Sequence, residues 1–455
     1  MWWEPATPTQ EYAGQVSLDA DGAVTIQLVG TLGGSPLPMK DPEPAVLHGL
    51  GNQGPFFTAR KLIRAGARIG MPGFPSEVLR PQSLIVGAHV DETTLYDEAI
   101  LQATYLSDWL QESGIRIEMR QGSNEQKGSV AASYVWPEIR TSQVAPGVTI
   151  STWSGHQGTP MRAGYTISET VALKITVETG VLVDDLVRDY VMPILDLVSF
   201  ATGRSNAVDR LTIRTPSVTQ TIGEQIQRED LEYVTEWIVK RPKVEPERLM
   251  IHHMRFALME APMGFDLLIQ RWYKLYKDLR PSLAPYFGLL YAPPTYVDLR
   301  LVSISQALEA YHRASKLRRA AMSKEDFAAF KKALLQACPP GKRGFLELKL
   351  GYLNEISQVD RTLQLIDRAK VALRRLLESR PDFAVDFINA RNIKTHPDQE
   401  KGDATGTQMY DLTRVGTFLF EANVMLDLGF DDTQCAALFE RQPEYMHLVN
   451  NPPAD

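Results

Sequence analysis

The spacing of hydrophobic and polar residues changes along the chain from strand-like to helix-like. Residues 15–30 (QVSLDADGAVTIQLVG) alternate on both sides of DADG, which predicts a β-hairpin. Gly and Pro punctuate the rest of the first 150 residues, where 97–114 is the one clear helical pattern, followed by Gly114 as a stop. Further strands are predicted at 55–66, 82–90, 115–122, 162–180 and 208–217.

Helical periodicity dominates from about residue 250 onward. An earlier helix is predicted at 182–203, with a kink at Pro193. Later helices are predicted at 266–291, 300–316, 324–337, 344–356, 361–380, 381–395 and 406–429. We therefore predict an α+β protein with a β-rich N-terminal domain (1–150), a mixed middle region (151–295) and an all-α helical bundle (296–455).

Composition places the chain among globular proteins of a reducing compartment. It has 455 residues, 44% of them hydrophobic and 23% charged, with only two cysteines, Cys338 and Cys435. Such isolated cysteines argue against a disulfide framework and a cysteine-based zinc site. The start MWWEPATPTQ lacks the features of a signal peptide, and no apolar run suits a membrane span, so we expect a cytoplasmic protein without membrane contact.

Charge is distributed unevenly along the chain. The net charge is −7, yet residues 311–375 hold 15 basic and 6 acidic residues. Such a basic band could face a phosphate backbone, or it could be an ordinary solvated helix face.

Two patterns resemble known sites only superficially. GLGNQG (49–54) has the glycine spacing of a dinucleotide-binding loop, but Pro55 and β-prone residues follow where a helix should begin. A glycine-rich turn is the better interpretation, and a nicotinamide enzyme would have to show bound cofactor absorbance. The histidines lack metal-ligand spacing, so we expect neither cofactor nor metal.

The stretch ARNIKTHPD (390–398) carries the chemistry that we consider most informative. Asn392 and His396 are four residues apart and share a helix face, and Pro397 disfavours helical geometry at His396. The guanidinium of Arg391 can grip a phosphate, the imidazole of His396 can move protons, and Asn392 can hold either group. These parts suffice for metal-independent RNA cleavage by the ribose 2′-OH. The same residues also fit a helix C-terminus with a favourable histidine cation and a solvated arginine.

The motif R-N-x-x-x-H, within a helical domain and followed by the apolar helix 406–429, resembles the HEPN superfamily of ribonucleases. Three segments look specifically like the ApeA-type HEPN proteins of bacterial anti-phage defence: 304–313 (ISQALEAYHR), 345–356 (FLELKLGYLNEI) and 45–62 (AVLHGLGNQGPFFTARKL).

The resemblance implies a role for each motif residue and for the domains. Arg391 would bind the scissile phosphate, His396 would be the general acid/base and Asn392 its polar support, giving a 2′,3′-cyclic phosphate and a 5′-OH. It also implies a homodimer or higher homo-oligomer through the helical domain, an RNA substrate for which tRNA is a candidate, a phage-derived trigger for abortive infection, and a sensing or regulatory N-terminal domain.

Four further residues are weaker candidates. Lys394, Arg374 and Arg375 could bind RNA as part of the basic band, and Glu309 could be an acidic participant or merely a surface or capping carboxylate. The alternative function is a non-catalytic HEPN protein, in which the helical domain dimerises or binds nucleotide and the β-rich part binds a ligand.

Overall fold

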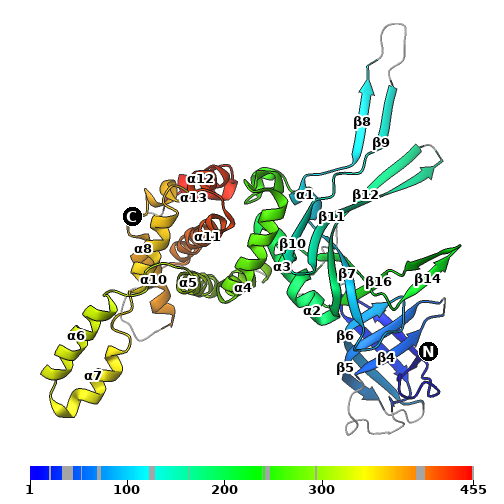
Figure 1. Cartoon of the computed structure of the whole chain (residues 1–455), viewed down its shortest axis with the longest axis horizontal. Coiled ribbons are helices and arrows are strands. Elements are labelled where there is room, and N and C mark those ends of the chain that lie inside the picture. The colour runs from blue at the N-terminus through cyan, green and yellow to red at the C-terminus, as the bar shows by residue number, and fades with distance from the viewer. Residues whose placement is uncertain are drawn as a thin grey trace. The chain divides into compact units, whose positions relative to one another are not determined.

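The computed structural model describes residues 1–19, 22–32, 45–52, 54–68, 73–121, 129–162, 164–237, 239–240, 246–292, 295–395 and 405–452. They form two compact units, 1–270 and 271–455, which we describe separately. The first unit is built on β-strands and the second on helices (Figure 1). The predicted α+β class, with β-structure first and a helical C-terminal part, is therefore confirmed.

A twelve-stranded antiparallel sheet organises the first unit. Its order is β1-β4-β5-β6-β16-β13-β7-β12-β11-β10, and the β2–β3 hairpin joins it through β3 and β6. The strands are β1 Trp2–Trp3, β2 Gly14–Leu18, β3 Val24–Val29, β4 Val46–Leu50, β5 Phe56–Arg68, β6 Ser76–Val86, β7 Leu95–Ala103, β10 Thr141–Ala145, β11 Val148–Met161, β12 Gly164–Leu182, β13 Val208–Arg214 and β16 Leu231–Thr235. Two hairpins stand apart from it, β8 Ile115–Arg120 with β9 Ser129–Tyr134, and β14 Thr219–Ile222 with β15 Gln225–Arg228.

The first unit also holds short helices. They are α1 Leu106–Leu110, α2 Val183–Leu186, the π-helical turn η3 Val187–Val191 and α3 Met192–Thr202, with 3₁₀ turns η4 Ile251–His253 and η5 Leu258–Glu260. Of these, α1 contacts the central strand β12, and α2 contacts the central strands β7 and β12. The helix predicted at 182–203 is confirmed, and its irregularity lies at η3, just before Pro193. Proline has no N–H to donate to the preceding turn, which explains the local widening.

The helix predicted at 97–114 is wrong. Residues 95–103 form strand β7 between β12 and β13, and only the short helix α1 follows. Because β7 is a central strand, its apolar residues are not confined to alternate positions, and the run imitates a helical pattern. Helix α1 ends at Gln111, whose backbone is left-handed with φ 54°, and does not continue to Gly114.

GLGNQG joins two neighbouring strands. β4 and β5 pair antiparallel on either side of it, with Leu50 opposite Phe56; Gln53 lies outside the described residues. No helix begins where a dinucleotide-binding loop requires one, so the turn interpretation is confirmed and the nicotinamide interpretation has no support.

The second unit is a helical bundle in which α5, α8, α10 and α11 pack against one another. Among the described helices, none is both long and apolar enough to cross a bilayer. The helices are α4 Gly264–Tyr291, which begins in the first unit, α5 Val297–Ala314, α6 Lys324–Ala337, η6 Pro340–Lys342, α7 Arg343–Leu350, α8 Gln358–Arg368, α9 Arg374–Leu377, α10 Phe383–Thr395, α11 Gly406–Leu428, α12 Asp432–Glu440 and α13 Pro443–Asn450.

The single helix predicted at 361–380 is interrupted. α8 ends at Arg368 and α9 begins at Arg374. The carboxylate of Asp432 accepts hydrogen bonds from the backbone N–H groups of Val371 (2.7 Å) and Ala372 (3.0 Å). A side chain 60 residues away in sequence thus takes donors that a continuous helix would use internally.

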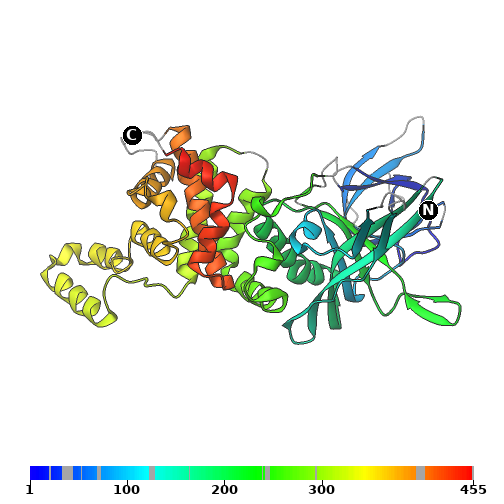
Figure 2. The same cartoon turned by 90° about the horizontal axis from the view of Figure 1, so that it is seen from above.

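Helices α6 and α7 form an arm that projects from the bundle (Figures 1 and 2). Helix α6 buries no residue, and Phe345, Leu348 and Tyr352 on and after α7 are 68%, 76% and 77% exposed. Asn354 closes the base of the arm by hydrogen bonds to both backbone groups of Met322. The helix predicted at 344–356 therefore ends early, at Leu350.

Candidate active site

Helix α10 places the Arg391–Asn392 pair at the surface of the bundle core. The predicted apolar stripe is confirmed, because Phe383, Phe387 and Ile388 are 2%, 0% and 7% exposed. The ring of Phe387 lies against α11 at Gly416, where an added Cβ would come within 3.0 Å of it. This close approach fixes the helix that carries the motif.

Arg391 and Asn392 are held together at the C-terminal end of α10. Arg391 Nη1 donates to Asn392 Oδ1 at 3.0 Å, and both side chains are half-buried. Arg391 Nε is buried and has no hydrogen-bond partner among the described residues. Buried donors normally find an acceptor, so this guanidinium has capacity left for an anionic oxygen.

The described part of α10 ends at Thr395. Its hydroxyl donates back to the carbonyls of Arg391 (3.1 Å) and Asn392 (3.3 Å). His396 lies outside the described residues, so its relation to Arg391 and Asn392 is known from the sequence spacing alone.

Lys394 is the one basic candidate that shares the helix with Arg391. Its Nζ lies 3.3 Å from Asp298 Oδ2 at the start of α5, so α5 and α10 run antiparallel here. Arg374 and Arg375 lie on α9 instead. Arg374 Nε is 4.0 Å from Glu378 Oε1, and Arg375 Nη1 is 3.5 Å from Glu440 Oε2. The structure therefore groups Lys394 with Arg391 and Asn392 but places the other two in separate ion pairs.

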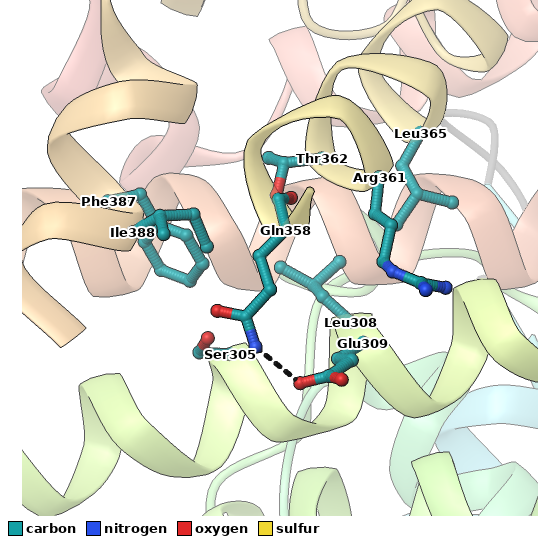
Figure 3. A pocket seen from close by; sticks show the side chains of 9 residues that line it. All are labelled: Ser305, Leu308, Glu309, Gln358, Arg361, Thr362, Leu365, Phe387 and Ile388. Atoms are coloured by element: carbon teal, nitrogen blue, oxygen red, sulfur yellow. Dashed lines mark hydrogen bonds between the residues drawn. The ribbon is translucent and has the colours of Figure 1, made fainter. Parts of the chain in front are cut away.

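Glu309 lines a small cavity between α5, α8 and α10 (Figure 3). Gln358 Nε2 donates to Glu309 Oε2 at 2.7 Å, and Arg313 Nε donates to Glu309 Oε1 at 3.1 Å. The cavity of about 10 Å³ is no larger than a water site. Glu309 is eleven residues after Asp298 on α5, about 16 Å along the helix axis. Since Asp298 contacts Lys394, Glu309 lies well away from the motif end of α10.

A buried polar network beside this cavity was not predicted. The His312 side chain is fully buried; Arg361 Nη1 lies 3.2 Å from its Nδ1, and Gln364 Oε1 lies 3.3 Å from its Nε2. Arg361 also donates to Glu355 at 3.0 Å. The sequence carries no signal for this group, because His312 and Arg361 are 49 residues apart.

We expect this network to make the second unit less stable in acid. Burial lowers the pKa of His312, and nearby Arg361, Arg319 and Arg313 lower it further, against the hydrogen bond from the imidazole to Gln364 Oε1, which raises it. The unfolded chain then binds a proton more readily than the folded one, so the stabilisation is complete above pH 6.5 and is lost as pH falls below it. We expect the free energy of unfolding of the helical unit to fall between pH 7.5 and 5, by at most about 1.4 kcal/mol per pH unit.

The measurement is urea denaturation of the full chain followed by circular dichroism at several pH values. His312→Gln should flatten the dependence, and His447→Gln, at an exposed histidine of α13, is the control substitution. Equal pH slopes for the wild type and His312→Gln would contradict the assignment.

Comparison with protein-family models identifies both parts of the chain. Residues 302–434 match the model "Apea-like HEPN", so the helical unit contains a HEPN domain, a class that generally dimerises and acts on RNA. Residues 1–221 match "ApeA N-terminal domain 1". The chain belongs to the ApeA-like HEPN proteins, which confirms the resemblance seen in the sequence. Comparisons with curated proteins and with solved structures give no match.

Proposed function

We propose that the chain is a HEPN endoribonuclease of anti-phage abortive infection. The observation that carries the proposal is the half-buried guanidinium of Arg391, tied to Asn392 and with an Nε that has no partner among the described residues, at the motif end of α10 in a HEPN domain. Such a donor set is suited to the charge that develops on a phosphate.

The proposed reaction needs no covalent enzyme intermediate. His396 takes the proton of the ribose 2′-OH, the 2′-oxygen forms a bond to phosphorus, and the bond from phosphorus to the 5′-oxygen breaks. The proton that His396 has taken then passes to the leaving 5′-oxygen, so the products are a 2′,3′-cyclic phosphate and a 5′-OH. Arg391 stabilises the phosphate oxygens, and Asn392 orients Arg391 through its amide oxygen.

We propose that two copies associate through the HEPN domain and bring two motifs together, with a phage-derived signal acting through the N-terminal unit. The substrate would be a cellular RNA, with tRNA as the first candidate to test.

The direct test is RNA cleavage by the purified chain in the presence of EDTA, with the product ends analysed. We expect fragments with 2′,3′-cyclic phosphate and 5′-OH ends, with the chelator causing no loss. Because a phage signal is part of the proposal, the assay is repeated with lysate from phage-infected cells. No cleavage under either condition would favour a non-catalytic HEPN protein.

We also propose that the α6–α7 arm contacts the RNA. It carries six cations that form no ion pair among the described residues: Lys324, Lys331, Lys332, Lys342, Arg343 and Lys349. The basic band (311–375) also has basic residues outside the arm, in the helical bundle. Most of these have carboxylate partners, including Arg313, Arg361, Arg368 and Arg375. Of the ten basic residues of the band (311–375) that form no ion pair among the described residues, six therefore lie on the arm.

Neutralising the arm should weaken RNA binding without unfolding the protein. For the triple variant Lys331→Gln, Lys332→Gln, Lys342→Gln we expect the slope of log K against log salt to fall by about 2. Its melting temperature should be unchanged, because α6 buries no residue. Fluorescence anisotropy with a labelled single-stranded RNA measures the slope.

The double variant Arg374→Gln, Arg375→Gln tests the pair predicted from the sequence. Its effect on the slope should be smaller than that of the arm variant, since Arg375 already faces Glu440. The reverse order of effects would place the RNA on α9 rather than on the arm.

A further inference from the structure

The β8–β9 hairpin projects from the first unit as a two-stranded sheet of its own (Figure 1). Its base is anchored to β12 through Glu169, which accepts hydrogen bonds from Ser113 Oγ (2.7 Å), the Gly114 N–H (2.7 Å) and Tyr134 OH (2.9 Å). Beyond this base, β8 pairs only with β9, and its outer edge has no strand partner in the described part of the chain. An isolated pair of strands is marginally stable in water, so a further strand would stabilise it.

The two faces of the hairpin differ sharply. The pairs Ile115–Tyr134, Ile117–Ala132 and Met119–Val130 lie on one face. Ile117, Met119 and Val130 are 61%, 76% and 70% exposed. The other face carries the charged residues of β8, Arg116, Glu118 and Arg120. Charged side chains normally protect an exposed edge against pairing, so a partner strand on this edge has to carry complementary charges.

The charge pattern of β8 is complementary to itself in one register. Suppose that Ile117 lies opposite Ile117 of a second copy in an antiparallel pair. Arg116 then lies opposite Glu118 of the second copy, and Glu118 lies opposite Arg116 of the second copy. Ile115 then meets Met119 of the second copy on the apolar face. This register uses residues 115–119, which all belong to β8.

Neighbouring registers are less favourable. Centring the pair on Glu118 places like charges opposite each other, Glu118 against Glu118 and Arg116 against Arg120. A register centred between Ile117 and Glu118 places the apolar face of one copy on the same side as the charged face of the other. Centring it on Met119 retains a Glu118–Arg120 pair but sets Ile117 against Gln121, beyond the end of β8.

We propose that β8 pairs with β8 of a second copy of this chain, centred on Ile117, to form a continuous four-stranded sheet. This interface lies in the first unit and does not depend on the proposed ribonuclease activity. Together with association through the HEPN domain, it would link chains into assemblies larger than a dimer.

Charge exchange tests the register. Arg116→Glu and Glu118→Arg should each raise the dissociation constant of this interface by about tenfold, because two opposite-charge pairs become like-charge pairs. Sedimentation velocity of the full chain should show the largest assembly halved in mass for each single variant. The double variant Arg116→Glu, Glu118→Arg restores opposite charges in this register and should restore the assembly. In the register centred on Met119, the double variant would instead set the new arginine of Glu118→Arg against Arg120, and the assembly would not recover.

Cross-linking provides a second measurement that does not depend on charge. Ile117→Cys should form an intermolecular disulfide on mild oxidation, because residue 117 faces its own copy across the two-fold axis. Val130→Cys, on β9 of the same face, is the matched control and should not. The proposal is overturned if the single charge variants keep the wild-type mass, if the double variant fails to recover it, or if Ile117→Cys cross-links no better than Val130→Cys.

Discussion

Replacing Arg391 with alanine is expected to reduce RNA cleavage by about 10²- to 10³-fold, and His396→Ala by about 10²- to 10⁴-fold. Arg391 and Asn392 are the motif residues whose positions the structure defines, through the hydrogen bond between them and their place after the buried turn of Phe387 and Ile388. On the proposed mechanism, the Arg391→Ala substitution would remove donors for the charge of the transition state, and we expect the helix to keep its packing because the buried apolar stripe of α10 is untouched. Arg391→Lys should recover little, because an ammonium cannot grip two phosphate oxygens as a guanidinium does.

Asn389→Ala provides the matched control for these variants. Asn389 is an exposed residue on α10, three residues before Asn392 and outside the apolar stripe. Cleavage by this variant should equal that of the wild type. Circular dichroism melting curves must coincide for all variants, so that a loss of activity is not a loss of fold.

Phage plating adds a cellular readout. Cells expressing the wild type should survive infection as a population and show new RNA fragments, whereas the Arg391→Ala and His396→Ala variants should give neither. If both alanine variants protect as well as the wild type at equal abundance, the nuclease proposal fails and the non-catalytic alternative takes its place.

The largest effect on stability is expected at Arg380. Its side chain is 3% exposed and its Nε donates to Asp411 Oδ2 at 2.8 Å. It also donates to the carbonyls of Leu376 and Leu448, both at 3.1 Å, and so joins α9, α11 and α13. Arg380→Met should lower the free energy of unfolding of the helical unit by about 3–5 kcal/mol, because Asp411 is left buried without its cation.

Urea denaturation followed by far-ultraviolet circular dichroism measures this change on the full chain. The double variant Arg380→Met, Asp411→Leu should be less destabilised than Arg380→Met alone, since no unpaired charge remains. Arg374→Met is the exposed control: its pair with Glu378 is 68% exposed on both sides, and its loss should change little. If Arg374→Met and Arg380→Met lowered the free energy of unfolding equally, burial would not set the energy of the Arg380–Asp411 pair.

Local patterns predicted much of the fold correctly. The hairpin of β2 and β3, the strand β12 and the helices α5, α6, α10 and α11 follow directly from periodicity and their end signals. The buried stripe of α10 is a good example, since Phe383, Phe387 and Ile388 recur at helical spacing whatever they pack against. The motif of Arg391, Asn392 and His396, and with it the family, is likewise a property of the sequence.

Partners distant in sequence decided the remainder. The local pattern of strand β7 predicts a helix, because the burial of the strand depends on β12 and β13. The break between α8 and α9 depends on the distant side chain of Asp432. Lys394, Arg375 and Glu309 all lie in ion pairs or hydrogen bonds that no local pattern shows. The sequence by itself determined the family, the α+β class and most helices of the second unit, because these rest on residue type and short-range spacing. Only the tertiary structure decided which charges are paired and which remain on the arm, because a charge is neutralised by its neighbour in space.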